Sequence, residues 1–221
     1  MTKKYDAQGT IEKILSASAE LFLEKGFEKT SMQDVAAAAG ISKGAIYHHF
    51  QSKEEILNAV AERQAHANQD VLERWLADTE ALNGREKLAA ILEKNLDSQQ
   101  AHALDSVMCV RMKSAEFVLS YMQDCVNRDA GWLADIIRQG VADGSLTTAF
   151  PDECAEVFLL LLNVWCDPAV FSCGYEKLSQ RLRFMQHLTG AIGLDVFDDA
   201  LLEKTLELLQ RLYPQETGEG E

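Results

Sequence analysis

Residues 30–53, with the sequence TSMQDVAAAAGISKGAIYHHFQSK, predict two short helices joined by a tight turn. Ser31 and Asp34 have the spacing of a capping box variant, in which a hydroxyl and a carboxylate stabilise the first turn of a helix. Gly40 stands at a position that tolerates left-handed backbone angles, so the first helix should end there. Ser42 is a second N-cap candidate, which predicts that the next helix begins directly after it.

The second helix is expected to have two different sides. Successive helical residues are rotated by about 100°, which places Ile46 and Phe50 on one side, where they can pack. The opposite side is small or polar, as in a helix that enters the major groove of DNA. There Lys43 can donate to guanine and Ala45 can touch a thymine methyl group, while flanking side chains meet phosphates. The expected DNA contacts are Lys43, Gly44, Ala45, Tyr47, His48, His49 and, at a phosphate, Lys53.

Taken together, these features resemble the DNA-binding domain of the TetR family of bacterial transcriptional regulators. The resemblance covers roughly the first quarter of the chain. It implies DNA contacts at Gln33, Lys43, Gly44, Tyr47, His49 and Lys53. Met32 stands where the family frequently has a polar residue, so no phosphate contact is counted there. The matching residues are Ile14, Ala17, Leu21, Phe22, Gly26, Phe27, Thr30, Ser31, Val35, Ala36, Ala39 to Ser42, Tyr47 to Phe50 and Ser52 to Glu55.

The remainder of the chain is predicted to be helical. An apolar stripe from Ile11 to Phe22 indicates a supporting helix that ends at Gly26, and Ser52 with Glu55 indicates a capping box for the helix after the turn motif. We therefore expect an all-α fold, with a three-helix helix-turn-helix domain at 1–53, a larger helical effector-binding and dimerisation domain at 54–214, and a disordered tail at 215–221. The later helices are expected at 53–82, 85–101, 105–114, 116–143, 152–166, 175–192 and 197–212.

The net charge of −14 is unevenly distributed along the chain. Residues 1–53 carry seven basic and six acidic residues, a balance of +1, while residues 54–221 carry 14 and 29, a balance of −15. An acidic remainder held away from a near-neutral DNA-binding domain suppresses non-specific binding, because that binding depends on phosphate neutralisation. The acidity is thus compatible with specific DNA binding without being evidence for it.

Two late segments are unusually apolar. The run VFLLLLNVW at 157–165 is apolar nearly all round, and the segment 178–192 can supply its cover. One interpretation is a core helix within a single subunit. The other, which the resemblance also implies, is a four-helix homodimer interface, and a dimer would read a palindromic operator with two recognition helices. The interface residues expected are Val157, Leu161, Leu178, Leu182, Met185 and Leu188.

Family members bind a small effector between the DNA-binding domain and this interface. The resemblance therefore implies a ligand pocket, although aromatic and Met side chains at helical spacing also simply pack in cores. The acidic and aromatic residues favour a hydrophobic or cationic effector. The candidate pocket residues are Met108, Cys109, Arg111, Met112, Phe117, Tyr121, Trp132, Phe158, Asn163 and Trp165.

The sequence favours a homodimeric repressor that binds palindromic double-stranded DNA and is released by the effector. Three other functions are alternatives: an enzyme, a helical interaction protein without DNA use, and a thiol redox sensor at Cys166 and Cys173. There is no HExxH, no GxSxG and no phosphate-binding glycine loop, so we expect no enzyme, cofactor or metal site. Five cysteines without a CxxC pair indicate reduced thiols. No apolar run approaches the roughly 20 residues of a membrane span, which favours a cytoplasmic protein.

Overall fold

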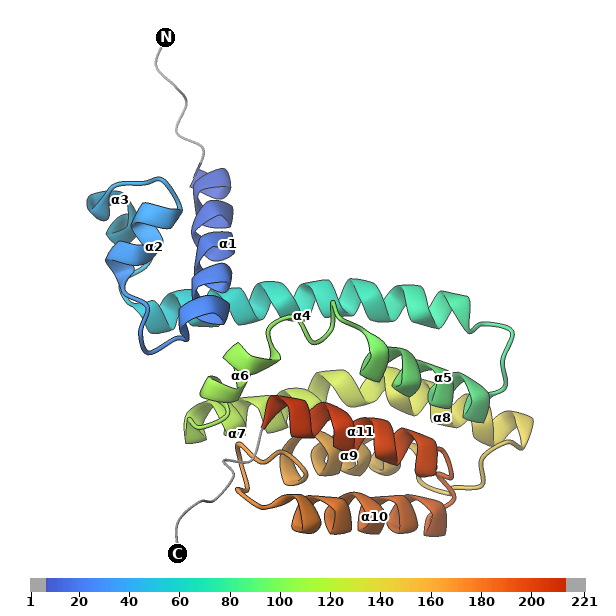
Figure 1. Cartoon of the computed structure of the whole chain (residues 1–221). Helices are drawn as coiled ribbons and strands as arrows, with labels where there is room; N and C mark the ends of the chain where they lie inside the picture. Colours follow the sequence, from blue (N-terminus) through green and yellow to red (C-terminus); the bar gives the residue numbers. More distant parts are fainter. Residues whose placement is uncertain (1–6, 214–221) are drawn as a thin grey trace, which may run out of the picture. The chain divides into compact units, whose positions relative to one another are not determined.

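The computed structural model describes residues 7–213, and every regular element within that range is a helix, which confirms the all-α prediction (Figure 1). The α-helices are α1 (Ala7–Lys25), α2 (Met32–Ala38), α3 (Lys43–His49), α4 (Lys53–Asp78), α5 (Gly84–Asp97), α6 (Asp105–Arg111), α7 (Ala115–Asp124), α8 (Ala130–Asp143), α9 (Pro151–Leu160), α10 (Tyr175–Ala191) and α11 (Asp199–Leu212). Two π-helical turns, η1 (Cys125–Asp129) and η2 (Leu161–Trp165), continue α7 and α9.

The chain forms two compact units. Within residues 7–213, the first comprises the residues up to Asp70 together with Gln100–Val110, and the second comprises Val71–Gln99 and the residues from Arg111 onward. Helix α4 is continuous across the division at residue 70. The domain boundary at residue 53 stays a prediction. The first compact unit includes that residue and extends to Asp70. The predicted disordered tail, 215–221, lies outside the described residues.

Most predicted helices occur at the expected places, with ends that differ for local reasons. The helix expected at 53–82 ends at Asp78, because the hydroxyl of Thr79 donates to the carbonyls of Trp75 (2.8 Å) and Leu76 (3.2 Å). Asn83 then caps α5 by accepting from the N–H of Glu86 at 2.9 Å. Similarly, the helices expected to end at residues 101 and 114 end at residues 97 and 111.

The first unit packs α1, α2, α3 and the beginning of α4 around one apolar core. Three isoleucines, one each on α1, α3 and α4, are fully buried there. Segment 100–110 adds Leu104 and Val107 to the same core. The seven-residue helices α2 and α3 are too short to be stable alone, so they depend on this packing. The fully buried members on these elements are Ile14, Val35, Ile46 and Ile56.

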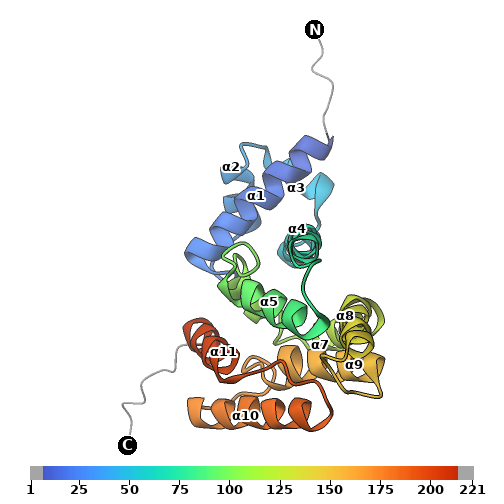
Figure 2. The ribbon, with the colours of Figure 1, turned by 90° about the vertical axis from the view of Figure 1, so that its right-hand side faces the viewer.

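The second unit is a helical layer structure built around α8, which packs against both α5 and α9. Helices α10 and α11 contact each other, and α11 also contacts α5. Figures 1 and 2 show α10 at the outer edge of this unit. No helix within residues 7–213 is long and apolar enough to cross a membrane. The large side chains with no exposed surface include Leu88, Leu133, Ile137, Leu182, Met185 and Leu194.

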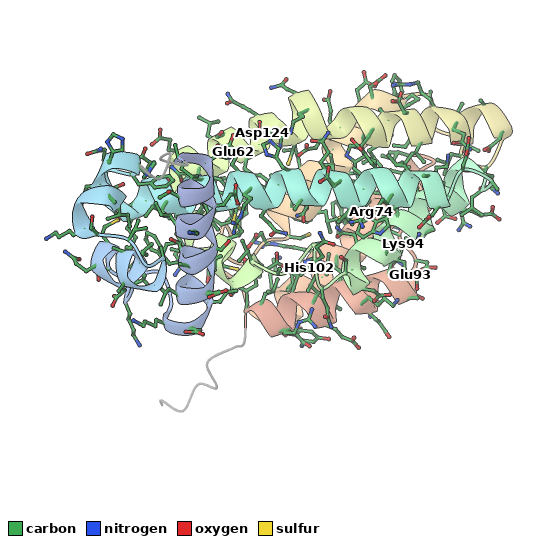
Figure 3. The ribbon with its side chains drawn as sticks, turned by 90° about the horizontal axis from the view of Figure 1, so that it is seen from above. Glu62, Arg74, Glu93, Lys94, His102 and Asp124 are labelled. Carbon is green, nitrogen blue, oxygen red and sulfur yellow. The ribbon has the colours of Figure 1, made fainter. Side chains whose placement is uncertain are left out.

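Charged side chains of α5 project from the second unit and are paired on its surface. Glu93 and Lys94 are labelled in Figure 3. The ammonium group of Lys94 lies 2.8 Å from a carboxylate oxygen of Asp78, and Glu93 shares the ammonium group of Lys204 with Asp97, at 2.8 and 2.9 Å. Exposed pairs of this kind contribute little to stability because water and salt screen them, so the core carries most of the stability.

Helices α5 and α8 approach each other so closely that a glycine is required at the contact. A Cβ added at Gly84 would overlap the backbone of Gly140 and stand 2.8 Å from the carbonyl oxygen of Ile136. The N–H of Gly84 also donates to a carboxylate oxygen of Asp143 at 2.8 Å, which fixes the beginning of α5 against the end of α8. A hydrogen bond from the Ser145 side chain, together with those from the N–H groups of Gly84 and Ser145, lowers the pKa of Asp143.

We expect Gly84→Ala to reduce the free energy of unfolding by about 1–3 kcal/mol, because the methyl group meets rigid backbone rather than a movable side chain. The measurement is urea denaturation followed by circular dichroism. Gly131→Ala is the matched control, since a Cβ there meets nothing within 4 Å on α8. This control should be neutral or stabilising by up to about 1 kcal/mol. Equal effects of the two substitutions would contradict the close approach.

Candidate nucleic-acid interface

The turn motif is held by side-chain caps at the start of both short helices. The hydroxyl of Ser31 accepts from the N–H of Asp34 at 3.2 Å, and the Asp34 carboxylate accepts from the N–H of Ser31 at 2.9 Å. These hydrogen bonds, with Lys25 nearby at 3.4 Å, lower the pKa of Asp34. The Ser42 hydroxyl accepts from the N–H of Ala45 at 3.2 Å. Both predicted caps are therefore confirmed.

Gly40 makes the turn between the two helices possible. Its φ of +66° lies in the left-handed region, where a side chain would be strained. The next residue, Ile41, donates its N–H to the carbonyl of Ala36 at 3.0 Å, which closes the end of α2. The predicted end of the first short helix at Gly40 is thus confirmed, and the direction of α3 follows from it.

Helix α3 has the packing side and the polar side that its sequence predicts. Ile46 has no exposed surface and Phe50 is 7% exposed, so this side is anchored in the core. Lys43, Gly44, Tyr47 and His48 are exposed, and Ala45 and His49 are half-buried. The rings of His48 and His49 meet edge to face with centroids 5.3 Å apart. The side chains expected at DNA are therefore accessible, and their individual contacts stay predictions.

Helix α2 presents Gln33 to solvent and turns Met32 inward. Met32 is 9% exposed and belongs to the same apolar core as Phe22 and Phe27. A thioether at this position fills the core instead of reaching a phosphate. The departure from a polar residue therefore has a packing explanation, and Gln33 remains the candidate contact on α2.

Lys53 has a structural role that the sequence did not reveal. Its ammonium group donates to the carbonyls of Phe27 (2.6 Å) and Glu28 (3.3 Å) and lies 4.2 Å from the centroid of the Phe27 ring. The side chain thereby ties the beginning of α4 to the loop that follows α1. An ammonium group has three donors, so one remains for the phosphate contact expected there.

The expected capping box at Ser52 and Glu55 is shifted by one residue. Ser52 accepts from the N–H of Glu55 at 3.1 Å, as predicted, but the Glu55 carboxylate accepts from the N–H of Gln51 at 2.6 Å rather than from Ser52. The Gln51 side chain donates to the carbonyl of Tyr47 at 2.9 Å. The end of α3 and the beginning of α4 are therefore linked through one short segment.

The candidate pocket residues do not all gather in one place. Phe158 is 1% exposed in the core of the second unit, whereas Met108 packs on the core of the first. Trp132 and Trp165 pack against the core of the second unit, and the Asn163 side chain bonds to Cys125. The second unit has an open hollow of about 470 Å³. Of the candidates, only Met112 lines it, together with Lys113, Ala115, Val118, Leu119, Met122, Ala169 and Val170.

Three of the expected dimer-interface residues are already covered within the subunit. Leu178 is 4% exposed and Leu182 and Met185 have no exposed surface, so the single-subunit interpretation holds for them. Sequence periodicity identified the apolar residues but not which side of α10 the other helices cover. Val157 is 42% exposed and Phe184 on α10 is 53% exposed, whereas Leu161 and Leu188 are half-buried.

The cysteines lie in different environments, and none of the five forms a disulfide. Cys166 has no exposed surface, and burial raises the pKa of its thiol to about 12. Burial likewise raises the pKa of Cys125 to about 11. Cys173 is half-buried, and its sulfur accepts a hydrogen bond from Arg181 at 3.4 Å. The two cysteines paired in the redox alternative are therefore not equivalent.

Comparison with known proteins agrees with this geometry. The family model described as bacterial regulatory proteins, tetR family, matches residues 14–60, which contain α2 and α3. The HTH-type transcriptional regulator YerO of Bacillus subtilis (strain 168) is 49% identical over 51 residues, 23% of this chain and 18% of YerO. YvdT of the same organism, also an HTH-type transcriptional regulator, is 27% identical over 143 residues, 63% of this chain and 71% of YvdT.

The fold of the whole chain is shared with solved regulators. The structure of a transcriptional regulator from Cytophaga hutchinsonii ATCC 33406 is similar with a TM-score of 0.62 and 18% identity, and the match covers 94% of this chain and 96% of that one. At this identity the likeness concerns the fold, while the detailed sequence agreement falls on the turn motif. The chain belongs to the TetR family of bacterial transcriptional regulators and carries the family's helix-turn-helix DNA-binding domain.

Proposed function

We propose that this protein is a homodimeric repressor that binds a palindromic operator in the cytoplasm and is released from it by a small-molecule effector. The observation that carries the proposal is the accessible side of α3, which two serine caps, one left-handed glycine and the buried Ile46 hold in place. A short helix with small residues in its first turn can approach base edges closely.

Lys43 and Lys53 have different roles in this proposal. Lys43 is exposed in the first turn of α3, the part of a recognition helix that comes closest to bases, and it can donate to guanine O6 or N7. Lys53 is held by two backbone carbonyls and can offer its remaining donor to a phosphate. Gln33, Tyr47 and His49 complete the proposed contacts to the DNA backbone.

The dimer is proposed to form through α9 and the uncovered side of α10. Tyr175 (44%), Phe184 (53%) and Ile192 (37%) are exposed on or beside α10, and Val157 (42%) is exposed on α9. Large exposed apolar side chains in this number are typical of an interaction surface. A second copy of the chain suits it, because two recognition helices about one helical turn of DNA apart read a palindrome.

Release is proposed to follow from a shift of α4. This helix begins at Lys53, directly after the recognition helix, and continues into the second unit. An effector that binds better when α4 is shifted would change the distance between the two recognition helices. That distance would then no longer match the spacing of the DNA groove. DNA binds one conformation more tightly and the effector binds the other. Repression and release then follow from this difference in affinity.

A second candidate, a thiol-responsive regulator, is favoured by one contact. Arg181 donates to the Cys173 sulfur at 3.4 Å and to the carbonyls of Trp165 and Phe171 at 3.2 and 3.1 Å. Modification of Cys173 would disturb these bonds next to the proposed dimer surface. The raised pKa of Cys166 makes it the less reactive partner of the pair, because the thiolate is the nucleophile.

The direct test of the leading proposal is footprinting on the DNA upstream of the protein's own gene. A protected palindrome whose affinity falls steeply with salt is expected. If the protein protects no specific site and binds only at low salt, the alternative of a helical interaction protein without DNA use is favoured instead.

Lys43→Gln is expected to weaken binding to the footprinted site by about 1–3 kcal/mol and to reduce the preference for that site over random duplex, because a base contact is lost. The measurement is fluorescence anisotropy with both duplexes at several salt concentrations. Lys94→Gln is the matched control, since it removes one positive charge from α5 and should leave DNA affinity unchanged.

Lys53→Gln provides the contrast to Lys43→Gln. It should weaken both duplexes alike and lower the salt dependence by about one counterion, as expected for a phosphate contact. Thermal unfolding measured in parallel reports how much the loss of its bonds to Phe27 and Glu28 destabilises the domain. Equal losses on both duplexes for both lysine variants would contradict the assignment of Lys43 to base reading.

Phe184→Glu is expected to shift the protein from dimer to monomer, because a charge would be buried against the partner's apolar surface. Sedimentation velocity over a range of concentrations measures this shift. Leu23→Glu is the control, since Leu23 is 48% exposed but lies on α1 in the first unit and not on α9 or α10. A wild-type monomer at micromolar concentration, or equal behaviour of both variants, would rule out this interface.

Cys173 is expected to react first when the folded protein is titrated with the thiol reagent DTNB at pH 8. Cys125 and Cys166 should react only after unfolding, because burial hides them and raises the pKa of each thiol. Cys173→Ser should remove the fast phase, and Arg181→Gln should slow it, since the guanidinium places positive charge beside the sulfur. Cys109 is also half-buried, so the comparison is made with Cys109→Ser present throughout. A fast phase that persists there in Cys173→Ser would exclude the second candidate.

A further inference from the structure

Arg111, the last residue of α6, stacks on an aromatic pair at the start of α7. Its guanidinium carbon lies 3.8 Å from the centroid of the Phe117 ring. The Phe117 ring is in turn nearly parallel to that of Tyr121, with an angle of 11° and centroids 5.9 Å apart. All three side chains are half-buried. The stack covers one face of the guanidinium group with apolar surface.

No anionic group of the described chain neutralises Arg111. Within residues 7–213 there are three half-buried arginines, and two of them have oxygen partners. Arg63 is bonded to Glu12 and Ser16, and Arg181 to two backbone carbonyls. Within the same range the Arg111 side chain forms neither an ion pair nor a hydrogen bond, in a chain with 35 acidic and only 21 basic residues. Its lack of a partner is therefore unusual here.

The acidic residues of α7 do not serve this guanidinium group. Asp124, labelled in Figure 3, pairs with Arg128 at 3.6 Å. Glu116 precedes Phe117 directly but is exposed and forms no ion pair with Arg111. Burial accordingly lowers the pKa of Arg111, because removal from water disfavours the charged form. A partly dehydrated cation of this kind is destabilising unless a partner binds it.

The stacking geometry indicates what that partner would be. A guanidinium group that stacks on a ring through one face keeps its edge N–H groups for an acceptor in its own plane. A carboxylate matches that edge with two parallel hydrogen bonds. The rings of Phe117 and Tyr121 lie beside it and suit a flat apolar body, since aromatic groups stack favourably.

We propose that Arg111, Phe117 and Tyr121 bind an aromatic monocarboxylate, and that this class of compound is the effector. The carboxylate pairs with the guanidinium edge, and the aromatic body packs along the two rings. The role of this compound as an effector rests on the proposed function, whereas the binding site itself does not. It replaces the cationic effector expected from the sequence, because a cation would be repelled by Arg111.

The test is calorimetric titration of the full chain, without DNA, with benzoate, phenylacetate and 1-naphthoate and with the corresponding amides. At least one carboxylate should bind at least tenfold more tightly than its uncharged amide. Arg111→Gln should abolish this discrimination, and Arg111→Lys should restore it in part. Arg211→Gln is the matched control, because Arg211 is exposed on α11, and it should bind like the wild type.

An independent readout is the thermal midpoint without ligand. Arg111→Gln should raise it, because an unpaired and partly buried charge is removed, whereas loss of a structural arginine would lower it. The chain also carries Glu216, Glu219 and Glu221 outside the described residues. Arg111→Gln is therefore also measured in a variant in which all three glutamates are changed to Gln. If it lowers the midpoint of the otherwise unchanged protein but not that of this variant, the three carboxylates are the partner of Arg111. That result would overturn the proposal.

Other outcomes also overturn it. Equal binding of acids and amides, no binding of any of the three carboxylates at millimolar concentration, or equally tight binding of inorganic phosphate would each exclude an aromatic carboxylate site. Release of the footprinted DNA by the bound carboxylate supports its role as effector, and binding without release removes that role. Failure of the chain to bind DNA would disprove the proposed function alone, because the titration contains no DNA.

Discussion

The burial of one side of α3 is the constraint on which the DNA-binding domain depends. A helix of seven residues is not stable by itself, since the cost of nucleation exceeds what so few hydrogen bonds return. Ile46 and Phe50 supply the missing stabilisation by packing into the core that α1, α2 and the start of α4 provide. Because these two side chains face inward, the small and polar residues on the opposite side of the helix must face outward.

A series of short-range bonds then fixes the angle at which that outward side is presented. Ser31 and Ser42 define where α2 and α3 begin, and the left-handed Gly40 defines how the chain turns between them. Lys53 adds a tie of longer range, from the start of α4 to the loop after α1. The beginning of α4 is therefore joined to the loop after α1, and the proposed release by an effector would act through this connection.

The second unit is tightly packed inside, but its surface carries an exposed apolar side chain and a guanidinium group without an acceptor among residues 7–213. Gly84 allows α5 and α8 to meet at backbone distance, which makes that contact rigid. At its edge, α10 buries Leu182 and leaves Phe184 exposed, and α6 ends in a guanidinium group without a described partner. A second copy of the chain and an anionic ligand would each satisfy one of these features. The two proposals are thus independent of each other.

The sequence by itself determined the helices and the DNA-binding motif, because caps, glycines and apolar spacing act over a few residues. Ser31, Gly40 and Ile46 all behave as their local pattern predicts. The candidate DNA face was therefore predictable, although the shifted bond of Glu55 and the two carbonyls bound by Lys53 were not. Those depend on atoms that approach only after the helices have packed.

Tertiary structure alone decided which apolar and charged side chains remain available. Periodicity marks Leu178, Leu182 and Met185 as apolar but cannot say whether a neighbouring helix or another subunit covers them, and the other helices of the unit do so. Likewise, the sequence places Arg111 among the candidate pocket residues, but no residue pattern shows that its side chain is half-buried without an oxygen partner in the described chain. Its burial and its stacking on Phe117 arise where α6 ends and α7 begins, and complementarity to a ligand is a property of that packing rather than of any residue pattern.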